Sequence, residues 1–174
     1  MKQAVLIIAY EKIFHLKDLI NVFSDDFRFY IHLDKKVRLS KEELQELEAD
    51  RRVALISRKY AVNWGSINLT KAILHLAREA SKSPEIAYLH LVSGADFPIM
   101  RSDEIINSLK NDSGTEFLES FRLANSTWEN QGMDRLIYYH FTNLLNVKRP
   151  LEKAIYKALL AIQRQLGVKR KISG

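Results

Sequence analysis

Four short apolar runs, separated by segments of helical periodicity, constrain the fold of this chain more than any other feature. The runs cover residues 3–9, 28–33, 52–56 and 86–92. Runs of this length with little alternation are typical of strands that are buried on both faces. Because helical spacing separates them, the sequence predicts an α/β protein with a mostly parallel sheet, flanking helices and right-handed crossovers.

Signals for helix starts fall between these runs. Ser40 and Glu43 form a capping box, in which each side chain bonds the backbone of the other. Ser66 or Asn68 is expected to cap a long helix, and Ser102 to open another. Residues 116–121 indicate a fifth strand, while residues 136–141 fit either a strand or a helix.

The net charge of +6 is concentrated near the carboxyl terminus. Residues 148–171 hold eight basic side chains and one acid, whereas the rest of the chain holds 19 basic and 20 acidic side chains. A neutral body is a poor surface for nucleic acid, so no nucleic-acid partner is expected. The sequence predicts a domain over residues 1–147 and a basic amphipathic helical tail over residues 148–174.

The tail has an apolar stripe at helical spacing. Its members are Leu151, Ala154, Ile155, Ala158, Leu159, Ile162 and Leu166. Two interpretations remain open: the stripe packs on the sheet, or it lies on a membrane surface. No apolar run reaches about 18 residues and no secretory signal is recognisable, so we expect a cytoplasmic chain, with the periphery of the inner membrane as the alternative.

Two acids directly follow apolar runs, and they are the leading candidates for chemistry. Asp34 and Asp96 each stand where a strand is expected to end, and ligands of open α/β sheets bind at that edge. The alternative for each is a carboxylate that caps a turn. Trp64 and Gly65 precede an expected helix and are candidates to line a base or sugar; the alternative is a core tryptophan with a capping serine.

Several established motifs are missing from the sequence. Neither glycine-rich phosphate loop occurs, there is no zincin spacing and no Asp-x-Asp pair, and the chain has no cysteine. A bound diphosphate would therefore need cationic side chains in place of a metal. The candidates from the expected exit loops are Lys35, Lys36, Arg58 and Lys59, with solvated lysines as the alternative.

Three blocks carry a resemblance to a known family. They read HLDKK at 32–36, VNWGS at 62–66 and YLHLVSGADFPI at 88–99. In this order and spacing they resemble the core-2/I-branching β-1,6-N-acetylglucosaminyltransferase family, and peptide O-xylosyltransferases share them. The resemblance covers residues 3–123 and implies the A-type glycosyltransferase fold, in which a Rossmann-like nucleotide-binding half precedes an acceptor half.

The resemblance also implies an activity. Such an enzyme is an inverting, metal-independent glycosyltransferase without cofactor. It moves a sugar such as N-acetylglucosamine from a UDP-sugar to a glycan or polysaccharide acceptor, as in polysaccharide biosynthesis. The alternative is a truncated, catalytically inactive UDP-sugar-binding module.

Site residues carry over by resemblance only. Those expected to bind the donor are Ile8, Ala9, Tyr10, Asp34, Trp64, Gly65 and Asp96. Asp34 is expected to accept a hydrogen bond from uracil, and Asp96 to lie near the donor. On the acceptor side the residues are Glu119 and Arg135, with a solvated strand-end acid as the alternative for Glu119.

The catalytic residues are not recognisable. The family's carboxylate base and diphosphate-binding cations follow a Gly-Ser-x-Trp-like segment and an Asp-Glu pair, neither of which occurs here. An inverting transfer needs a base to deprotonate the acceptor hydroxyl. We therefore expect the base beyond Gly174 and an incomplete fold in these 174 residues.

Overall fold

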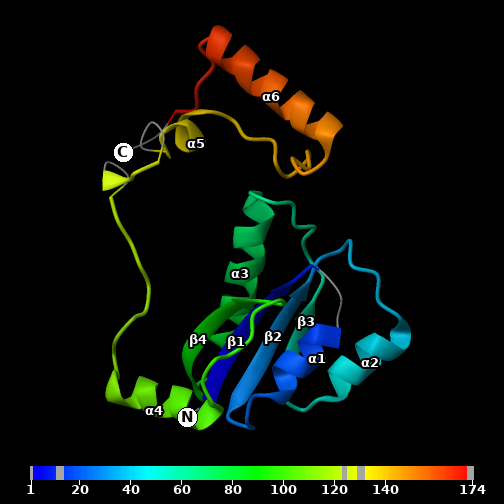
Figure 1. Ribbon diagram of the computed structural model, residues 1–174, viewed down its shortest axis with the longest axis vertical. Helices are drawn as coiled ribbons and strands as arrows, with labels where there is room; N and C mark the ends of the chain where they lie inside the picture. Colours follow the sequence, from blue (N-terminus) through cyan, green and yellow to red (C-terminus); the bar gives the residue numbers. More distant parts are fainter. Residues whose placement is uncertain (1, 11–13, 123–124, 129–131, 172–174) are drawn as a thin grey trace. The chain divides into compact units, whose positions relative to one another are not determined.

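The computed structural model describes residues 2–10, 14–122, 125–128 and 132–171 (Figure 1). The chain forms two compact units. One contains the chain up to Val62 together with Ile67–Ser113, and the other contains Asn63–Ser66 together with Gly114–Gly174. The division expected at residue 147 stays a prediction.

Strands and helices alternate strictly in the first unit. In chain order they are β1 (Lys2–Ala9), α1 (Phe14–Asn21), β2 (Phe27–Leu33), α2 (Lys41–Ala49), β3 (Val53–Ser57), α3 (Ile67–Ala80), β4 (Ile86–Ser93) and α4 (Ser102–Asn111). The strands pair in the order β3-β2-β1-β4, and every pair is parallel. The predicted α/β, Rossmann-like fold is confirmed.

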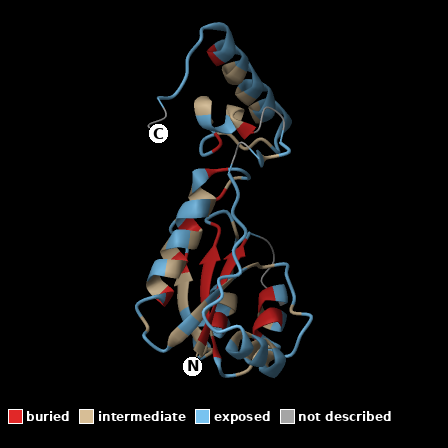
Figure 2. Cartoon of the chain, turned by 90° about the vertical axis from the view of Figure 1, so that its left-hand side faces the viewer, coloured by how far each residue is buried: buried red, intermediate tan, exposed pale blue. Residues whose placement is uncertain are grey.

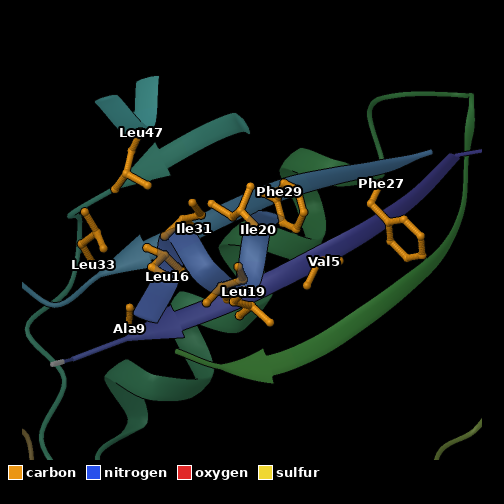
Figure 3. Close-up of a cluster of buried hydrophobic side chains, with 11 residues drawn as sticks. Val5, Ala9, Leu16, Leu19, Ile20, Phe27, Phe29, Ile31, Leu33 and Leu47 are labelled. Atoms are coloured by element: carbon orange, nitrogen blue, oxygen red, sulfur yellow. The ribbon is translucent and has the colours of Figure 1, made fainter. Parts of the chain in front are cut away.

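Two hydrophobic clusters lie on opposite faces of this sheet. One joins α1 and α2 to alternate residues of β1 and β2, with Ile105 and Ile106 of α4 packed against it. Figure 3 shows Leu16, Leu19 and Ile20 of α1 over these strands. The other cluster joins α3 to the remaining residues of the same strands. Because both faces are covered, β1 and β2 read as continuous apolar runs.

The fourth strand differs from the expectation of a buried strand. It lies at the edge of the sheet, and its side chains alternate between partly buried and exposed. Leu89 and Leu91 are 42% and 53% exposed. An apolar run alone does not distinguish a central strand from an edge strand, since the difference depends on which neighbour covers it.

The second unit holds two helices among its described residues, α5 (Asp134–Ile137) and α6 (Pro150–Gln165). The fifth strand expected at 116–121 is wrong, because these residues form neither helix nor strand. A strand needs a paired neighbour, and the described part of this unit contains none. The ambiguous segment 136–141 ends a short helix and continues as irregular chain.

The predicted helix starts are confirmed in part. Ser40 and Glu43 form the capping box of α2, with hydrogen bonds of 3.1 and 2.8 Å. Ser102 opens α4, but its hydroxyl accepts from the backbone N–H of Ser24 at 3.0 Å rather than capping its own helix. The hydroxyl of Ser66 is buried and has no hydrogen-bond partner among the described residues.

Candidate functional site

The strand order reverses direction between β1 and β4, and ligands of such sheets bind outside the carboxyl ends of the strands at this point. The end of β1 is bonded to both neighbours. The backbone N–H of Asp34, after β2, donates to the carbonyl of Ala9 at 2.9 Å. The backbone N–H of Gly94, after β4, donates to the carbonyl of Ile8 at 3.0 Å. Three strand ends therefore form one continuous rim in the first unit.

Gly94 allows two backbones to meet at this rim. A Cβ atom added to it would lie 3.0 Å from the Cβ of Ala9 and 3.3 Å from its Cα. Such distances are shorter than ordinary van der Waals contact, so any larger residue would push the loop after β4 away from β1.

Asp34 is buried and organises the loops around it. One carboxylate oxygen accepts from the backbone N–H of Lys36 at 2.8 Å, and the other accepts from that of Val62 at 3.0 Å. The ammonium of Lys36 lies 3.6 Å from the second oxygen and donates to the carbonyl of Val62 at 2.8 Å. The carboxylate thus performs the turn-capping role weighed above, and its role toward uracil stays a prediction.

Asp96 lies on an exposed turn at the end of β4. Its carboxylate accepts from the backbone N–H of Ser93 at 2.6 Å, and its own N–H donates to the carbonyl of Ser93 at 3.2 Å. The two predicted acids therefore both follow strands at the same edge of the sheet, one buried and one exposed.

The three residues expected from β1 differ in accessibility. Ile8 and Ala9 are each 4% exposed and belong to the two core clusters. Tyr10 follows the strand and is 52% exposed, so its side chain is open to a ligand at the rim.

Three of the four candidate cations have structural contacts, and the Lys59 ammonium lies 5.7 Å from the centroid of the Tyr60 ring. The Lys36 ammonium bonds the loop at Val62, as described above, and the Arg58 guanidinium donates to the carbonyls of Lys35 and Val37 at 3.2 and 2.6 Å. These contacts hold the loops after β2 and β3 together. The alternative of merely solvated side chains is therefore wrong for Lys36 and Arg58.

A cavity of about 170 Å³ lies beneath the loop after β4. It is lined mainly by apolar side chains of β1, β4, α1 and α4, together with His90 and Asp96. Sites for drug-sized ligands measure about 300–1,000 Å³, so this cavity is too small for a nucleotide sugar.

Two histidines lie inside strands, His32 in β2 and His90 in β4. The ring of His32 is fully buried and its Nδ1 lies 2.9 Å from the carbonyl of Ser57, to which it donates. The Nε2 of His90 lies 3.1 Å from the side-chain oxygen of Gln3. Burial lowers the pKa of both rings, which favours neutral imidazoles with a structural role.

Trp64 and Gly65 belong to the second unit. Trp64 is 69% exposed, so the alternative of a core tryptophan is wrong. Gly65 has φ +70°, a conformation that glycine adopts without strain, and its carbonyl accepts from the Thr142 hydroxyl at 2.9 Å. The side chain of Asn63 donates to the carbonyls of Thr142 and Asn143. The exposed indole of Trp64 therefore lies on a turn that hydrogen bonds to residues 142–143 hold in place.

The candidate acceptor residues also lie in the second unit. Glu119 is exposed on irregular chain. The guanidinium carbon of Arg135 lies 4.1 Å from the centroid of the Trp128 ring, a cation–π contact, and Phe121 meets the same ring edge-on. The binding of one donor by Asp34, Trp64 and Asp96 together stays a prediction.

Sequence reasoning gave no role to Gly94, Asn63 and Thr142. A glycine immediately after a strand, at a reversal of strand order, was a readable signal for the first of these. The bonds from Asn63 and Gly65 to residues 142–143 join positions nearly eighty apart, and nothing local in the sequence indicates them.

Comparisons of the sequence with known proteins identify a family and several relatives. The model of the family described as Core-2/I-Branching enzyme matches residues 4–157. Human xylosyltransferase 2 is 27% identical over 139 residues, which cover 77% of this chain and 16% of that protein. Mouse xylosyltransferase 1 is 30% identical over 120 residues, covering 66% of this chain and 12% of that protein. The chain thus spans less than a fifth of the length of these relatives.

Proposed function

Because this chain belongs to the Core-2/I-Branching enzyme family, we propose that it is the nucleotide-sugar-binding part of a glycosyltransferase. The proposed reaction is an inverting, metal-independent transfer of a sugar, such as N-acetylglucosamine, from a UDP-sugar to a glycan or polysaccharide. Because the relatives are named xylosyltransferases, UDP-xylose is a further donor to test.

The observation that carries the proposal is the rim at the strand reversal. The ends of β1, β2 and β4 are joined there by backbone hydrogen bonds, and two of the family's blocks supply the residues at the ends of β2 and β4. Tyr10, with an exposed ring, follows β1, and Asp96, with an exposed carboxylate, follows β4, at the edge of the sheet where the buried Asp34 follows β2. This is the arrangement of polar groups at an apolar edge that nucleotide sites use.

Asp34 retains capacity for a ligand despite its two backbone partners. Each carboxylate oxygen has two lone-pair directions, so a second donor can approach an oxygen that already accepts one hydrogen bond. The N–H of a uracil ring is such a donor. In this proposal the carboxylate both fixes the loops and selects the base.

The proposal is tested by calorimetry on the 174-residue chain with UDP, UDP-N-acetylglucosamine and UDP-xylose, with ADP as the competing nucleotide. We expect uridine nucleotides to bind and ADP to bind at least about tenfold more weakly, because a base-selective hydrogen bond is lost. Asp96→Asn keeps an acceptor for the N–H of Ser93, and we expect it to weaken the binding of the UDP-sugars.

The matched control is Asp26→Asn, which changes a partly exposed acid before β2, at the opposite edge of the sheet. The proposal would be overturned if Asp96→Asn and Asp26→Asn lost the same affinity for UDP-sugars. It would also be overturned if the folded protein bound no uridine nucleotide. A transfer assay with and without a chelator then separates the alternatives. Binding without transfer identifies a binding module, and transfer that stops with the chelator contradicts metal independence.

The described residues contain no group of three or more His, Asp or Glu side chains suited to a metal ion. Metal independence therefore rests on the resemblance and on the chelator experiment. Within residues 2–10, 14–122, 125–128 and 132–171, no helix is both long enough and apolar enough to cross a bilayer. A cytoplasmic location is part of the proposal.

A further inference from the structure

The helix α6 leaves an apolar stripe uncovered in the structure. Leu151, Ile155, Ile162 and Leu166 are 73%, 44%, 49% and 72% exposed. Their spacing of four, seven and four residues places them on one side of the helix, since 3.6 residues make one turn. Figure 2 shows the helix largely pale blue and tan, with a buried position near one end.

Other positions of α6, outside the stripe, make specific polar contacts. The side chain of Gln163 donates to the carbonyl of Tyr139 at 3.0 Å and accepts from its N–H at 2.8 Å. The Tyr156 hydroxyl lies 2.6 Å from Nδ1 of His140, and Arg164 pairs with Asp134 at 2.7 Å. These bonds fix the rotation of the helix about its axis, so the stripe faces outward as a consequence of the fold of its own unit.

Positive charge lies at both ends of the stripe. Lys148 and Arg149 precede the helix, and Lys169, Arg170 and Lys171 follow it, all exposed. Lys153 and Lys157 add charge on the body of the helix, and residues 148–171 contain one acid, Glu152. An apolar strip bounded by cations matches an anionic lipid surface, in which acyl chains receive the strip and head groups meet the charges.

We propose that α6 docks this chain peripherally on anionic lipid bilayers through Leu151, Ile155, Ile162 and Leu166. The cations at both ends supply attraction to the head groups, and the apolar side chains supply the insertion. The contact is reversible, because its apolar area is small and part of its energy is electrostatic. It is independent of nucleotide binding at the rim of the sheet.

The test is flotation of the full chain with vesicles of phosphatidylcholine alone and with added phosphatidylglycerol. We expect binding to the anionic vesicles, weaker binding at high salt, and little binding to the neutral ones. Leu151→Gln combined with Leu166→Gln should reduce partitioning by about tenfold or more, because two exposed apolar side chains leave the contact. Both positions are more than 70% exposed, so the fold should persist.

The matched control is Leu144→Gln, which alters a leucine 79% exposed elsewhere in the same unit. Lys169→Gln with Lys171→Gln should weaken the preference for anionic vesicles. Equal partitioning of the stripe and control variants, or equal binding to neutral and anionic vesicles, would sink the idea. A dimer in solution that the stripe variant dissociates, without any vesicle binding, would assign the stripe to a second copy instead.

Discussion

At the scale of single residues, Asp34 shows how one carboxylate can hold a site in place. Its oxygens satisfy the backbone N–H groups of Lys36 and Val62, which lie on loops after different strands. The sequence placed this acid correctly at a strand end. The partner at Val62, however, lies 28 residues later and is set by tertiary structure, so no local pattern could have identified it.

Asp34→Ala should lower the free energy of unfolding by about 1–3 kcal/mol, because it leaves two backbone N–H groups without their acceptor. Urea denaturation followed by circular dichroism measures the change. Asp26→Ala, at a partly exposed acid that pairs with Lys2, should stay within about 0.5 kcal/mol of the parent chain. Equal stability of the two variants would contradict the role given to Asp34.

The buried histidines predict a dependence of stability on pH. The folded pKa values of His32 and His90 lie below the ordinary 6.5, since burial favours the neutral ring. The unfolded chain then binds more protons than the folded chain as pH falls below about 6.5. The stabilisation from neutral rings is complete above that pH, and it is lost as pH falls toward the lowered folded values.

The free energy of unfolding, measured by urea denaturation at about pH 7.5 and about pH 5.5, should therefore be larger at the higher pH. His90→Gln should flatten this dependence, because it removes one of the two rings whose pKa is lowered by burial while keeping a polar side chain beside Gln3. The control His15→Gln changes an exposed histidine. An unchanged slope in His90→Gln would show that burial of this ring does not govern the pH response.

At the scale of elements, sequence patterns predicted correctly the strands and helix starts that depend on interactions within a few residues. The apolar runs of β1 and β2 and the capping box of α2 are each specified within a few residues, and the structure has them. The exposure of β4 and the missing strand at 116–121 depend on which neighbour lies alongside. Such a neighbour is a property of the assembled sheet, so neither outcome could be read from the runs themselves.

The junction of β1 and β4 can be tested by exchanging two side chains. Gly94→Ala should destabilise the fold by about 1–3 kcal/mol, because the new Cβ would crowd Ala9. The double variant Ala9→Gly with Gly94→Ala should recover part of that loss, since it removes the opposing Cβ. Denaturation of all four proteins of the cycle gives the coupling energy. A coupling of zero would mean that the two positions do not press on each other.

At the scale of the whole molecule, the two units differ in how they are stabilised. The first has two apolar clusters on a four-stranded sheet, whereas the second has no sheet among its described residues and is held by side-chain hydrogen bonds such as those of Gln163. Residues 115–122 are exposed and form neither helix nor strand. Exposed irregular segments are the preferred sites of proteolysis.

Limited trypsin digestion should therefore cut after Arg122, in this exposed segment, before it cuts within any helix or strand, and mass spectrometry identifies the product. Arg122→Gln should abolish this cut without changing thermal stability, because no packed element is altered. An early cut at Lys71, within α3, would contradict the prediction, since it would mean that a helix covering the sheet opens more readily than the segment after α4.

The assignment of Asn63–Ser66 to the second unit has a consequence for biogenesis. This tetrapeptide leaves the ribosome long before Thr142 and Asn143, the residues that bond it. All four strands of the sheet are synthesised once translation passes Ser93. The turn that carries Trp64 obtains its hydrogen-bond partners only when Thr142 and Asn143 have been synthesised. Nascent chains arrested before Thr142 leaves the ribosome should thus contain a folded sheet, while the turn at Trp64 lacks its hydrogen bonds.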